Sequence, residues 1–165
     1  MPHRSIVNAR RVREVLTYNQ KTGAFTWCVQ TGPRVVVGAF AGTKNVRGYY
    51  EISIDGRKYV AHRLAWLYVT GSWPVDEIDH VNGNRADNRF CNLRDVPRAI
   101  NTQNRRKANA GTSSKLLGVS KHGVKWRARL QTNGCVAQLG TYDTPEKAYA
   151  AYVTAKRKMH TGCTI

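Results

Sequence analysis

The sequence predicts an α+β protein made of two small units joined by a linker. Short runs of alternating polar and apolar residues lie on either side of turn pairs such as Asp55-Gly56 and Asn133-Gly134, a pattern typical of antiparallel hairpins. Apolar residues at helical spacing occur in a few separate segments. At 165 residues, the chain is long enough for one ordinary domain or two small ones.

The first part of the chain predicts a helix, a small sheet and a second helix. Val12, Val15 and Leu16 share one face of a helix expected over residues 8–18. We expect residues 18–61 to form a small antiparallel sheet, with strands at 24–28, 34–41, 49–54 and 58–61. A second helix over 61–69 is then ended by Gly71 and Pro74.

A strand, a polar loop, another strand and a helix are expected next. They cover residues 78–81, 82–89, about 93–94, and 97 to about 107, with Pro97 suited to a first helical position. Small polar residues over 108–115 predict a linker. We therefore expect one domain over residues 1–107 and a second over 116–165.

The second domain predicts a three-stranded antiparallel sheet backed by one helix. Strand patterns lie at 117–121, 126–131 and 136–142. Thr144-Pro145-Glu146 then supplies a cap, a first-position proline and an early acid for a helix.

The charge of the chain points to a polyanionic partner. Lys and Arg number 27 against 10 Asp and Glu, giving a formal net charge of +17. Nucleic acid is the expected partner, because neutralising phosphates releases counterions. A membrane surface is disfavoured, since no basic amphipathic helix stands out and no apolar run reaches spanning length.

The four cysteines contain no Cys-x-x-Cys pair, so a structural zinc site is not expected. Without a leader segment, the cysteines are expected to be reduced.

The few acids are concentrated beside a histidine. Asp76, Glu77, Asp79 and Asp87 are four of the ten, a grouping that suits either a bound cation or a turn. His80 is a candidate general base, because imidazole titrates near neutral pH. The carboxylate of Asp79 and the amide oxygen of Asn101 are candidate ligands for a hard cation.

These residues lie at fixed distances from a further asparagine: Asn92 follows His80 by twelve positions, and Asn101 follows Asn92 by nine. The spacing resembles the HNH nuclease motif. Further segments, 61–66, 71–74, 78–84, 87–89 and 91–94, resemble phage-type HNH endonucleases. The resemblance implies a ββα-metal core over about 75–107 that hydrolyses DNA phosphodiester bonds.

The same resemblance implies a role for each of four residues. Asp79 and Asn101 bind one divalent metal ion, His80 activates water, and Asn92 pins the loop between the two strands. Asparagine at the last position favours Mg²⁺ or Mn²⁺ over zinc. No small-molecule cofactor is expected.

Candidate DNA contacts surround this motif. Arg85, Arg89, Arg94 and Arg105 are candidate phosphate contacts, although each one alone is also compatible with an ordinary solvated charge. Asn104, on the same helix face as Asn101, is a candidate ligand or DNA contact, and we favour the contact. His62 opens an apolar helix and is expected to be structural.

Three segments of the tail, 117–120, 125–130 and 139–152, follow a recognisable pattern. Together they resemble the plant ethylene-response-factor (Apetala-type) DNA-binding domain. It implies a sheet that docks in the major groove of double-stranded DNA. Strand alternation places Trp126, Ala128 and Leu130 toward the helix. It places on the opposite, outward face Ser120, His122, Arg127, Arg129, Gln131, Val136 and Gln138. A basic sheet domain without sequence preference is the alternative.

The sequence therefore predicts a homing-type, site-directed DNA endonuclease. The alternative is a DNA-binding regulator with an inactive nuclease core, and an RNA-binding role is weaker because no single-strand RNA motif is present. A phage-encoded protein would act in the cytoplasm of a bacterial host. The target sequence, nicking or double-strand cutting, the choice between monomer and homodimer, the metal, and a free-standing or intron-encoded origin stay open.

Overall fold

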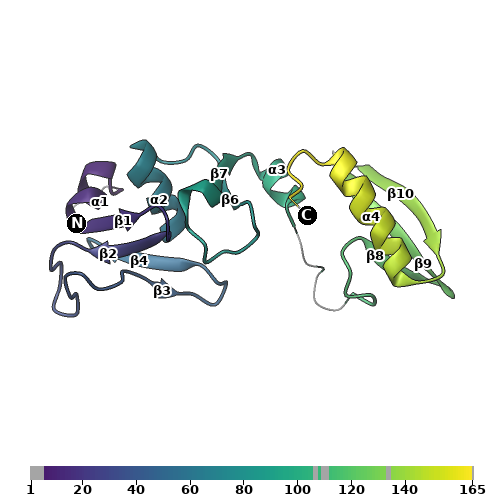
Figure 1. Cartoon of the computed structure of the whole chain (residues 1–165), viewed down its shortest axis with the longest axis horizontal. Helices are drawn as coiled ribbons and strands as arrows, with labels where there is room; N and C mark the ends of the chain where they lie inside the picture. The colour runs from purple at the N-terminus through teal and green to yellow at the C-terminus, as the bar shows by residue number, and fades with distance from the viewer. Residues whose placement is uncertain (1–5, 106–107, 109–111, 133–134, 165) are drawn as a thin grey trace, which may run out of the picture. The chain divides into compact units, whose positions relative to one another are not determined.

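The computed structural model describes residues 6–105, 108, 112–132 and 135–164, and it divides into two compact units. The first is Met1–Pro97 and the second is Arg98–Ile165. Across the described residues there are four α-helices and four small antiparallel sheets (Figure 1), which confirms the expected mixture of helices and small antiparallel sheets. The expected linker over 108–115 lies partly outside the described residues.

The first unit begins with helix α1, Ala9–Val15, and strands β1, Leu16–Asn19, and β2, Ala24–Trp27. The Asn8 side chain caps α1 by accepting a hydrogen bond from the Arg11 N–H at 2.9 Å. The helix expected to reach residue 18 ends at Val15. Residues 16–19 instead pair antiparallel with β2, which buries Leu16 in the core by strand alternation.

The region expected to form one sheet over 18–61 contains two. The second sheet joins β3, Thr43–Lys44, to β4, Tyr50–Ile54, and β4 to β5, Arg57–Val60. The strand expected over 34–41 is wrong: in this segment only Phe40 makes an isolated bridge, to Thr26. Gly38 has a φ of +83°, which interrupts an extended run.

Helix α2, Ala61–Thr70, follows β5 directly and ends at Gly71, whose φ is +82°. Figure 1 shows α1 and α2 on the same side of β1, β2 and β4. Their facing residues form the core of the unit, which includes Val12, Val15, Leu16, Phe25, Ile52, Ile54, Leu64 and Leu67. The same core includes Ile78 and Leu93 of the hairpin that follows, so it positions that hairpin within the unit.

The hairpin that follows contains β6, Glu77–His80, and β7, Leu93–Val96, with the short 3₁₀ helix η1, Phe90–Asn92, before β7. The two strands pair antiparallel. Helix α3, Arg98–Gln103, comes next, so the expected order of strand, loop, strand and helix is observed. The helix is shorter than expected and ends before residue 107.

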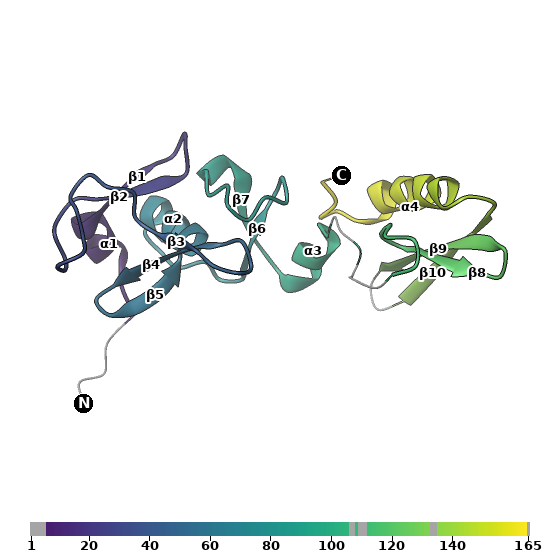
Figure 2. The ribbon, with the colours of Figure 1, turned by 90° about the horizontal axis from the view of Figure 1, so that it is seen from below.

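The second unit contains β8, Val119–His122, β9, Lys125–Thr132, β10, Cys135–Tyr142, and α4, Pro145–Met159. The sheet order is β10-β9-β8, and α4 covers one face of it (Figure 2). The core joins the two layers through Val119, Ala128, Leu130, Ala148 and Tyr152. The expected three-stranded sheet backed by one helix is therefore observed.

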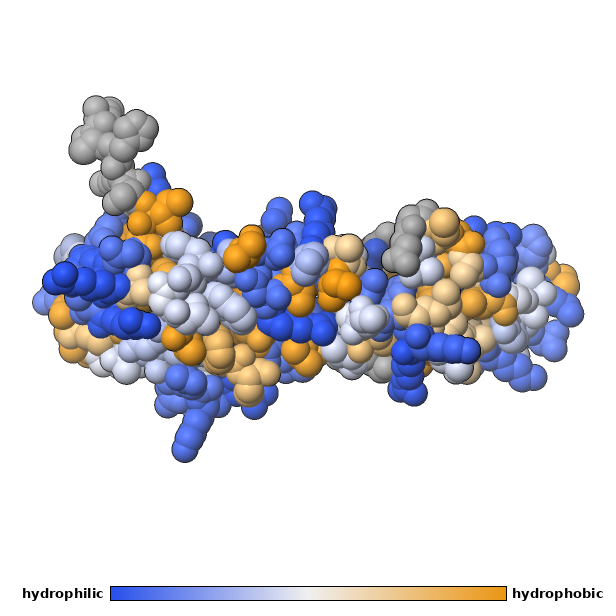
Figure 3. Space-filling view, turned by 90° about the horizontal axis from the view of Figure 1, so that it is seen from above, coloured by the Kyte–Doolittle hydropathy of each residue, from blue (hydrophilic) through white to orange (hydrophobic). Residues whose placement is uncertain are grey.

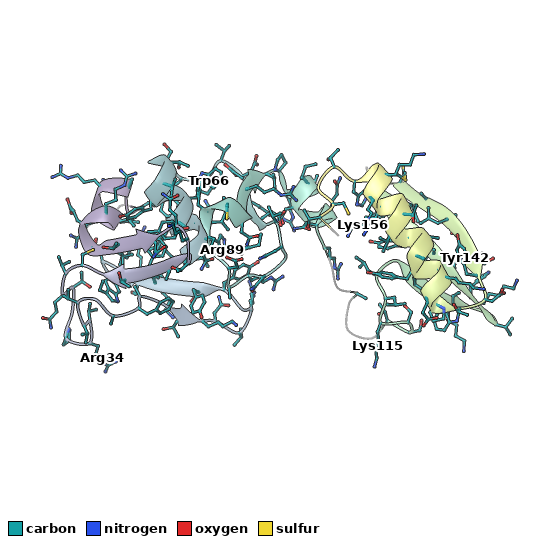
Figure 4. The ribbon with its side chains drawn as sticks, in the orientation of Figure 1. Arg34, Trp66, Arg89, Lys115, Tyr142 and Lys156 are labelled. Atoms are coloured by element: carbon teal, nitrogen blue, oxygen red, sulfur yellow. The ribbon has the colours of Figure 1, made fainter. Side chains whose placement is uncertain are left out.

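Helix α3 and the residues just after it contact α4 and the chain end that follows α4. The Gln103 side chain accepts a hydrogen bond from the Gly162 N–H at 3.0 Å, and the Lys156 ammonium donates to the Arg105 carbonyl at 2.5 Å. Lys156 lies on α4 and is buried (Figure 4). These contacts explain why α3 belongs to the second unit although it follows β7 directly.

Among the described residues, every helix is too short or too polar to cross a lipid bilayer. Figure 3 shows hydrophilic and hydrophobic residues interspersed over the visible face of both units.

A substitution at Gly118 would test the packing of the second unit. Its φ is +75°, and an added Cβ would overlap the Tyr152 ring and lie 2.8 Å from the Arg129 carbonyl oxygen. We expect Gly118→Ala to lower the free energy of unfolding by about 2–4 kcal/mol, measured by chemical denaturation. The matched control is Gly123→Ala, because Gly123 has a φ of +60° and open space around it, so its cost is about 1 kcal/mol. Equal losses for the two variants would contradict this packing.

Candidate active site

The β6–β7 hairpin places Asp79 and His80 in the interior of the first unit. Both are buried, with 5% and 4% of their surface exposed. Asp79 lies directly opposite Arg94, and His80 lies opposite Leu93. Because neighbouring residues on a strand point to opposite faces, the carboxylate and the imidazole have different surroundings.

The Asp79 carboxylate forms an ion pair with Arg94. Its Oδ2 accepts hydrogen bonds from Arg94 Nε at 2.8 Å and from an Arg94 terminal nitrogen at 2.7 Å. The Asp79 side chain is 6% exposed and that of Arg94 is 28% exposed. Burying a carboxylate costs free energy unless a partner of opposite charge offsets the lost hydration, and the guanidinium provides one.

The His80 imidazole lies among other rings and one amide. Its Nε2 is 3.5 Å from Asn88 Oδ1, and its ring centroid is 5.0 Å from His62, edge to face, and 5.9 Å from Tyr49. Burial lowers the pKa of His80, an effect that Asn88 and Asp79 partly offset. At neutral pH this imidazole is therefore uncharged and able to accept a proton.

His62 packs against His80 from α2. Burial, reinforced by His80 and Arg63, lowers the pKa of His62 to about 3. Its Nδ1 has no hydrogen-bond partner within the described part of the chain, and its ring is 5.1 Å from Tyr49. His62 thus forms a neutral, buried wall beside His80, in keeping with the structural role expected from its apolar helix.

Asn92 closes the loop between β6 and β7. Its Oδ1 accepts from the Asn82 N–H at 2.9 Å, and its Nδ2 donates to the Asp87 carbonyl at 2.8 Å. Its own carbonyl accepts from the Val81 N–H at 2.9 Å. One residue therefore links both ends of the loop that carries Asn88.

The loop is also held by its own charges. Asp87 accepts from the Asn82 side chain at 2.7 Å and from Arg89 at 2.6 Å, and Arg89 lowers the pKa of Asp87 to about 2. The Arg85 guanidinium lies 5.0 Å from the Tyr49 ring and donates to the Arg47 carbonyl at 3.1 Å. Arg85 and Arg89 are both exposed, which suits contact with phosphates; Arg89 is labelled in Figure 4.

The other sequence candidates of this motif lie in the second unit. Asn101 lies on α3 and is half-buried. Asn104 is buried and accepts a hydrogen bond from the Thr164 hydroxyl, so in this arrangement its amide is engaged inside the second unit instead of facing outward. Arg105 is exposed, and its carbonyl accepts from Lys156.

The candidate DNA-reading face is the side of the sheet away from α4. Ala128 and Leu130 are buried beneath α4, whereas Arg129 and Gln131, which alternate with them on β9, are exposed. Three of the cross-strand pairs on this face are Ser120 with Arg127, Arg129 with Gln138, and Gln131 with Val136, and a fourth joins His122 to Lys125. Ser120 Oγ and Arg127 Nε are buried without a hydrogen-bond partner among the described residues. The burial of Ala128 and Leu130 and the exposure of Arg129 and Gln131 match the alternation expected along β9.

The donor atoms of the motif suit a hard cation. No group of three or more His, Cys, Asp or Glu within the described residues is placed to hold a metal ion. Asp79 and Asn101 supply a carboxylate and an amide oxygen, which oxygen-preferring ions select. The Arg94 guanidinium on Asp79 shows that this carboxylate accommodates a positive charge.

Residues 59–103 match the model of a protein family described as HNH endonuclease. The matched segment runs from β5 to α3 and includes Asp79, His80, Asn92 and Asn101. The match supports nuclease activity in the broad sense, with DNA as the substrate and a divalent metal ion as the family's usual cofactor. No curated protein and no solved structure matches the chain.

Two residues beside His80 were not assigned a role from the sequence. Asn88 is 3% exposed and lies within reach of the imidazole, and Tyr49 connects the Arg85 guanidinium to both histidine rings. A signal for Asn88 was present, because it lies in the polar loop only eight residues after His80. Tyr49 is far from the motif in sequence, so local pattern gave no signal for it.

The loop closure by Asn92 can be tested directly. Asn92→Ala leaves the Asn82 N–H and the Asp87 carbonyl without their partners, and we expect it to lower the free energy of unfolding by about 1–3 kcal/mol. Hydrogen exchange at the Asn82 amide should also become faster. The control is Asn84→Ala, which removes only a bond to the Ala86 N–H within the exposed loop. Unchanged protection of Asn82 in Asn92→Ala would show that the amide does not close the loop.

Proposed function

We propose that this protein is a metal-dependent, site-directed DNA endonuclease of the homing type, with His80 as the general base. The observation that carries the proposal is the buried, neutral His80 imidazole next to the Asp79 carboxylate, within the segment that matches HNH endonucleases. A neutral imidazole can remove a proton from water, and a nearby carboxylate can help to hold a cation.

In this proposal each side chain has one task. His80 takes the proton from the attacking water, while Asn88 and His62 limit the orientation of its ring. Asn92 holds the loop closed. Asp79 and Asn101 would hold one divalent ion, Mg²⁺ or Mn²⁺, which stabilises the negative charge on the leaving oxygen when bound.

The DNA would be bound by basic residues of both units. Arg85 and Arg89 on the loop, and Arg105 after α3, are exposed and suited to phosphates. The outward face of the sheet supplies Arg127, Arg129 and Gln131 for the bases or the backbone. A phage-encoded protein acting in the bacterial cytoplasm is part of the same proposal.

A DNA-binding regulator with an inactive nuclease core is the second candidate. One observation favours it: Arg94 already occupies Oδ2 of the proposed metal ligand Asp79. A regulator would bind DNA with similar affinity whether or not Mg²⁺ is present, and would leave it intact.

Plasmid relaxation in the presence of Mg²⁺ separates the two candidates. We expect the wild type to nick or linearise supercoiled plasmid and EDTA to stop it. His80→Ala should lower turnover by about 10²–10⁴-fold, because general-base catalysis contributes about that much, while DNA affinity changes little. Asp79→Ala should abolish Mg²⁺-supported cleavage, and the matched control Asp76→Ala, an exposed acid nearby, should not. Cleavage that persists in EDTA would rule out the metal-dependent mechanism.

The role of the sheet face is tested by removing exposed groups from it. Arg129→Gln with Gln131→Ala should weaken sequence preference in footprinting, since base-edge contacts specify the site. If Arg129 contacts a phosphate, the slope of log affinity against log salt should also fall by about 0.9. Lys158→Gln on α4 removes an exposed charge away from this face and serves as the control. Full selectivity in the double variant would place the reading of sequence elsewhere in the chain.

A further inference from the structure

We propose that Arg94 is an internal counter-ion that competes with the metal ion for Asp79, and that DNA relieves this competition by drawing Arg94 to a phosphate. The inference rests on the proposed function, because it takes Asp79 as a metal ligand. It goes further by making metal binding and DNA binding cooperative. The protein would then hold its metal weakly until DNA is present.

The Arg94 guanidinium already contacts the Asp79 carboxylate. Two nitrogens of the same guanidinium converge on a single oxygen, Asp79 Oδ2, at 2.8 and 2.7 Å. The pair is fixed by the hairpin, since Asp79 and Arg94 are direct cross-strand partners. Arg94 therefore holds the position next to this oxygen that a cation bound there would need.

A metal ion and Arg94 cannot both hold this oxygen without cost. The Asp79 side chain is only 6% exposed, so water screens little of the repulsion between two positive charges placed beside it. In the protein without DNA, the guanidinium therefore lowers the affinity of the carboxylate for a divalent cation. Removing the guanidinium should raise that affinity.

Arg94 is placed to leave for a phosphate. Its side chain is 28% exposed, more than four times the exposed fraction of its partner, so the guanidinium reaches solvent from the buried pair. Guanidinium groups bind phosphate through paired, charge-assisted hydrogen bonds. A DNA phosphate near the exposed part of Arg94 would give the guanidinium a second anion to bind. The Asp79 carboxylate could then bind the metal ion.

The neighbouring pair of Arg89 and Asp87 provides a control. It has the same chemistry, with an N–O distance of 2.6 Å, and it lies on the loop of the same hairpin. Asp87 is not a proposed metal ligand, however, and Arg89 is 45% exposed. Substituting Arg89 removes one positive charge from the same region without releasing Asp79.

The first experiment measures Mn²⁺ binding by electron paramagnetic resonance in the absence of DNA, using the full chain at neutral pH. We expect Arg94→Gln to bind Mn²⁺ about tenfold more tightly than the wild type, a typical coupling between two sites. Arg94→Lys, which keeps the charge, should show a smaller change. Arg89→Gln should change Mn²⁺ affinity much less than Arg94→Gln does, and Asp79→Asn should lose the site. Thermal unfolding of each variant confirms that it is folded.

The second experiment adds a short DNA duplex. The His80→Ala background keeps the duplex intact, and Asp79→Asn measures Mn²⁺ bound by the DNA itself. DNA should tighten Mn²⁺ binding about tenfold in His80→Ala, and this gain should disappear in His80→Ala with Arg94→Gln. By linkage, Mn²⁺ should raise DNA affinity by the same factor, which fluorescence anisotropy measures.

The outcomes separate this inference from the proposed function. Weaker Mn²⁺ binding in Arg94→Gln would overturn the competition and make Arg94 a residue that orients Asp79 for the metal. The competition would also be overturned if Mn²⁺ binding depends on Asp79 but its affinity changes neither in Arg94→Gln nor on adding DNA. The metal site itself would then remain supported. Absence of any Asp79-dependent Mn²⁺ binding, with or without DNA, would overturn the metal site and the inference together.

Discussion

The closure of the β6–β7 loop by the Asn92 amide is the constraint on which the candidate site depends. The loop is polar and contributes almost nothing to the hydrophobic core, so hydrogen bonds must hold it. By joining Asn82 to Asp87, the amide fixes the backbone that carries Asn88 to the imidazole of His80. The chemistry proposed for His80 is thus supported by a residue that has no part in proton transfer.

The scarce acids of this basic chain organise its structure. Asp79 and Asp87 each pair with an arginine, and Asp95 accepts from the backbone N–H groups of Val75 and Asp76 just before β6. Asp95 thereby holds the entry to the hairpin, while Asp79 and Asp87 hold its interior and its loop. The excess positive charge is available to bind a polyanion. If DNA drew Arg94 or Arg89 to a phosphate, the carboxylate of Asp79 or Asp87 would lose its contact with that guanidinium.

Helix α3 belongs to the family match in sequence and to the second unit in packing. The matched segment ends at residue 103, the last residue of α3, and Pro97 alone separates that helix from β7. Yet Gln103 and Asn104 bond to the chain end that follows α4. The proposed metal ligands Asp79 and Asn101 consequently belong to different compact units, although both lie in the matched segment.

The sequence by itself determined the elements with strong local signals. The Asp55-Gly56 turn, the end of α2 at Gly71, the Thr144-Pro145 start of α4 and the order of strand, loop, strand and helix around His80 all follow from neighbours in the chain. The tertiary structure alone decided that residues 16–19 pair with β2, that residues 34–41 form no strand, and that Arg94 pairs with Asp79. It likewise decided the burial of Asn104 and the place of Tyr49 beside both histidines. The physical reason is that these features arise from contacts between residues distant in sequence, where pairing and burial override local preference.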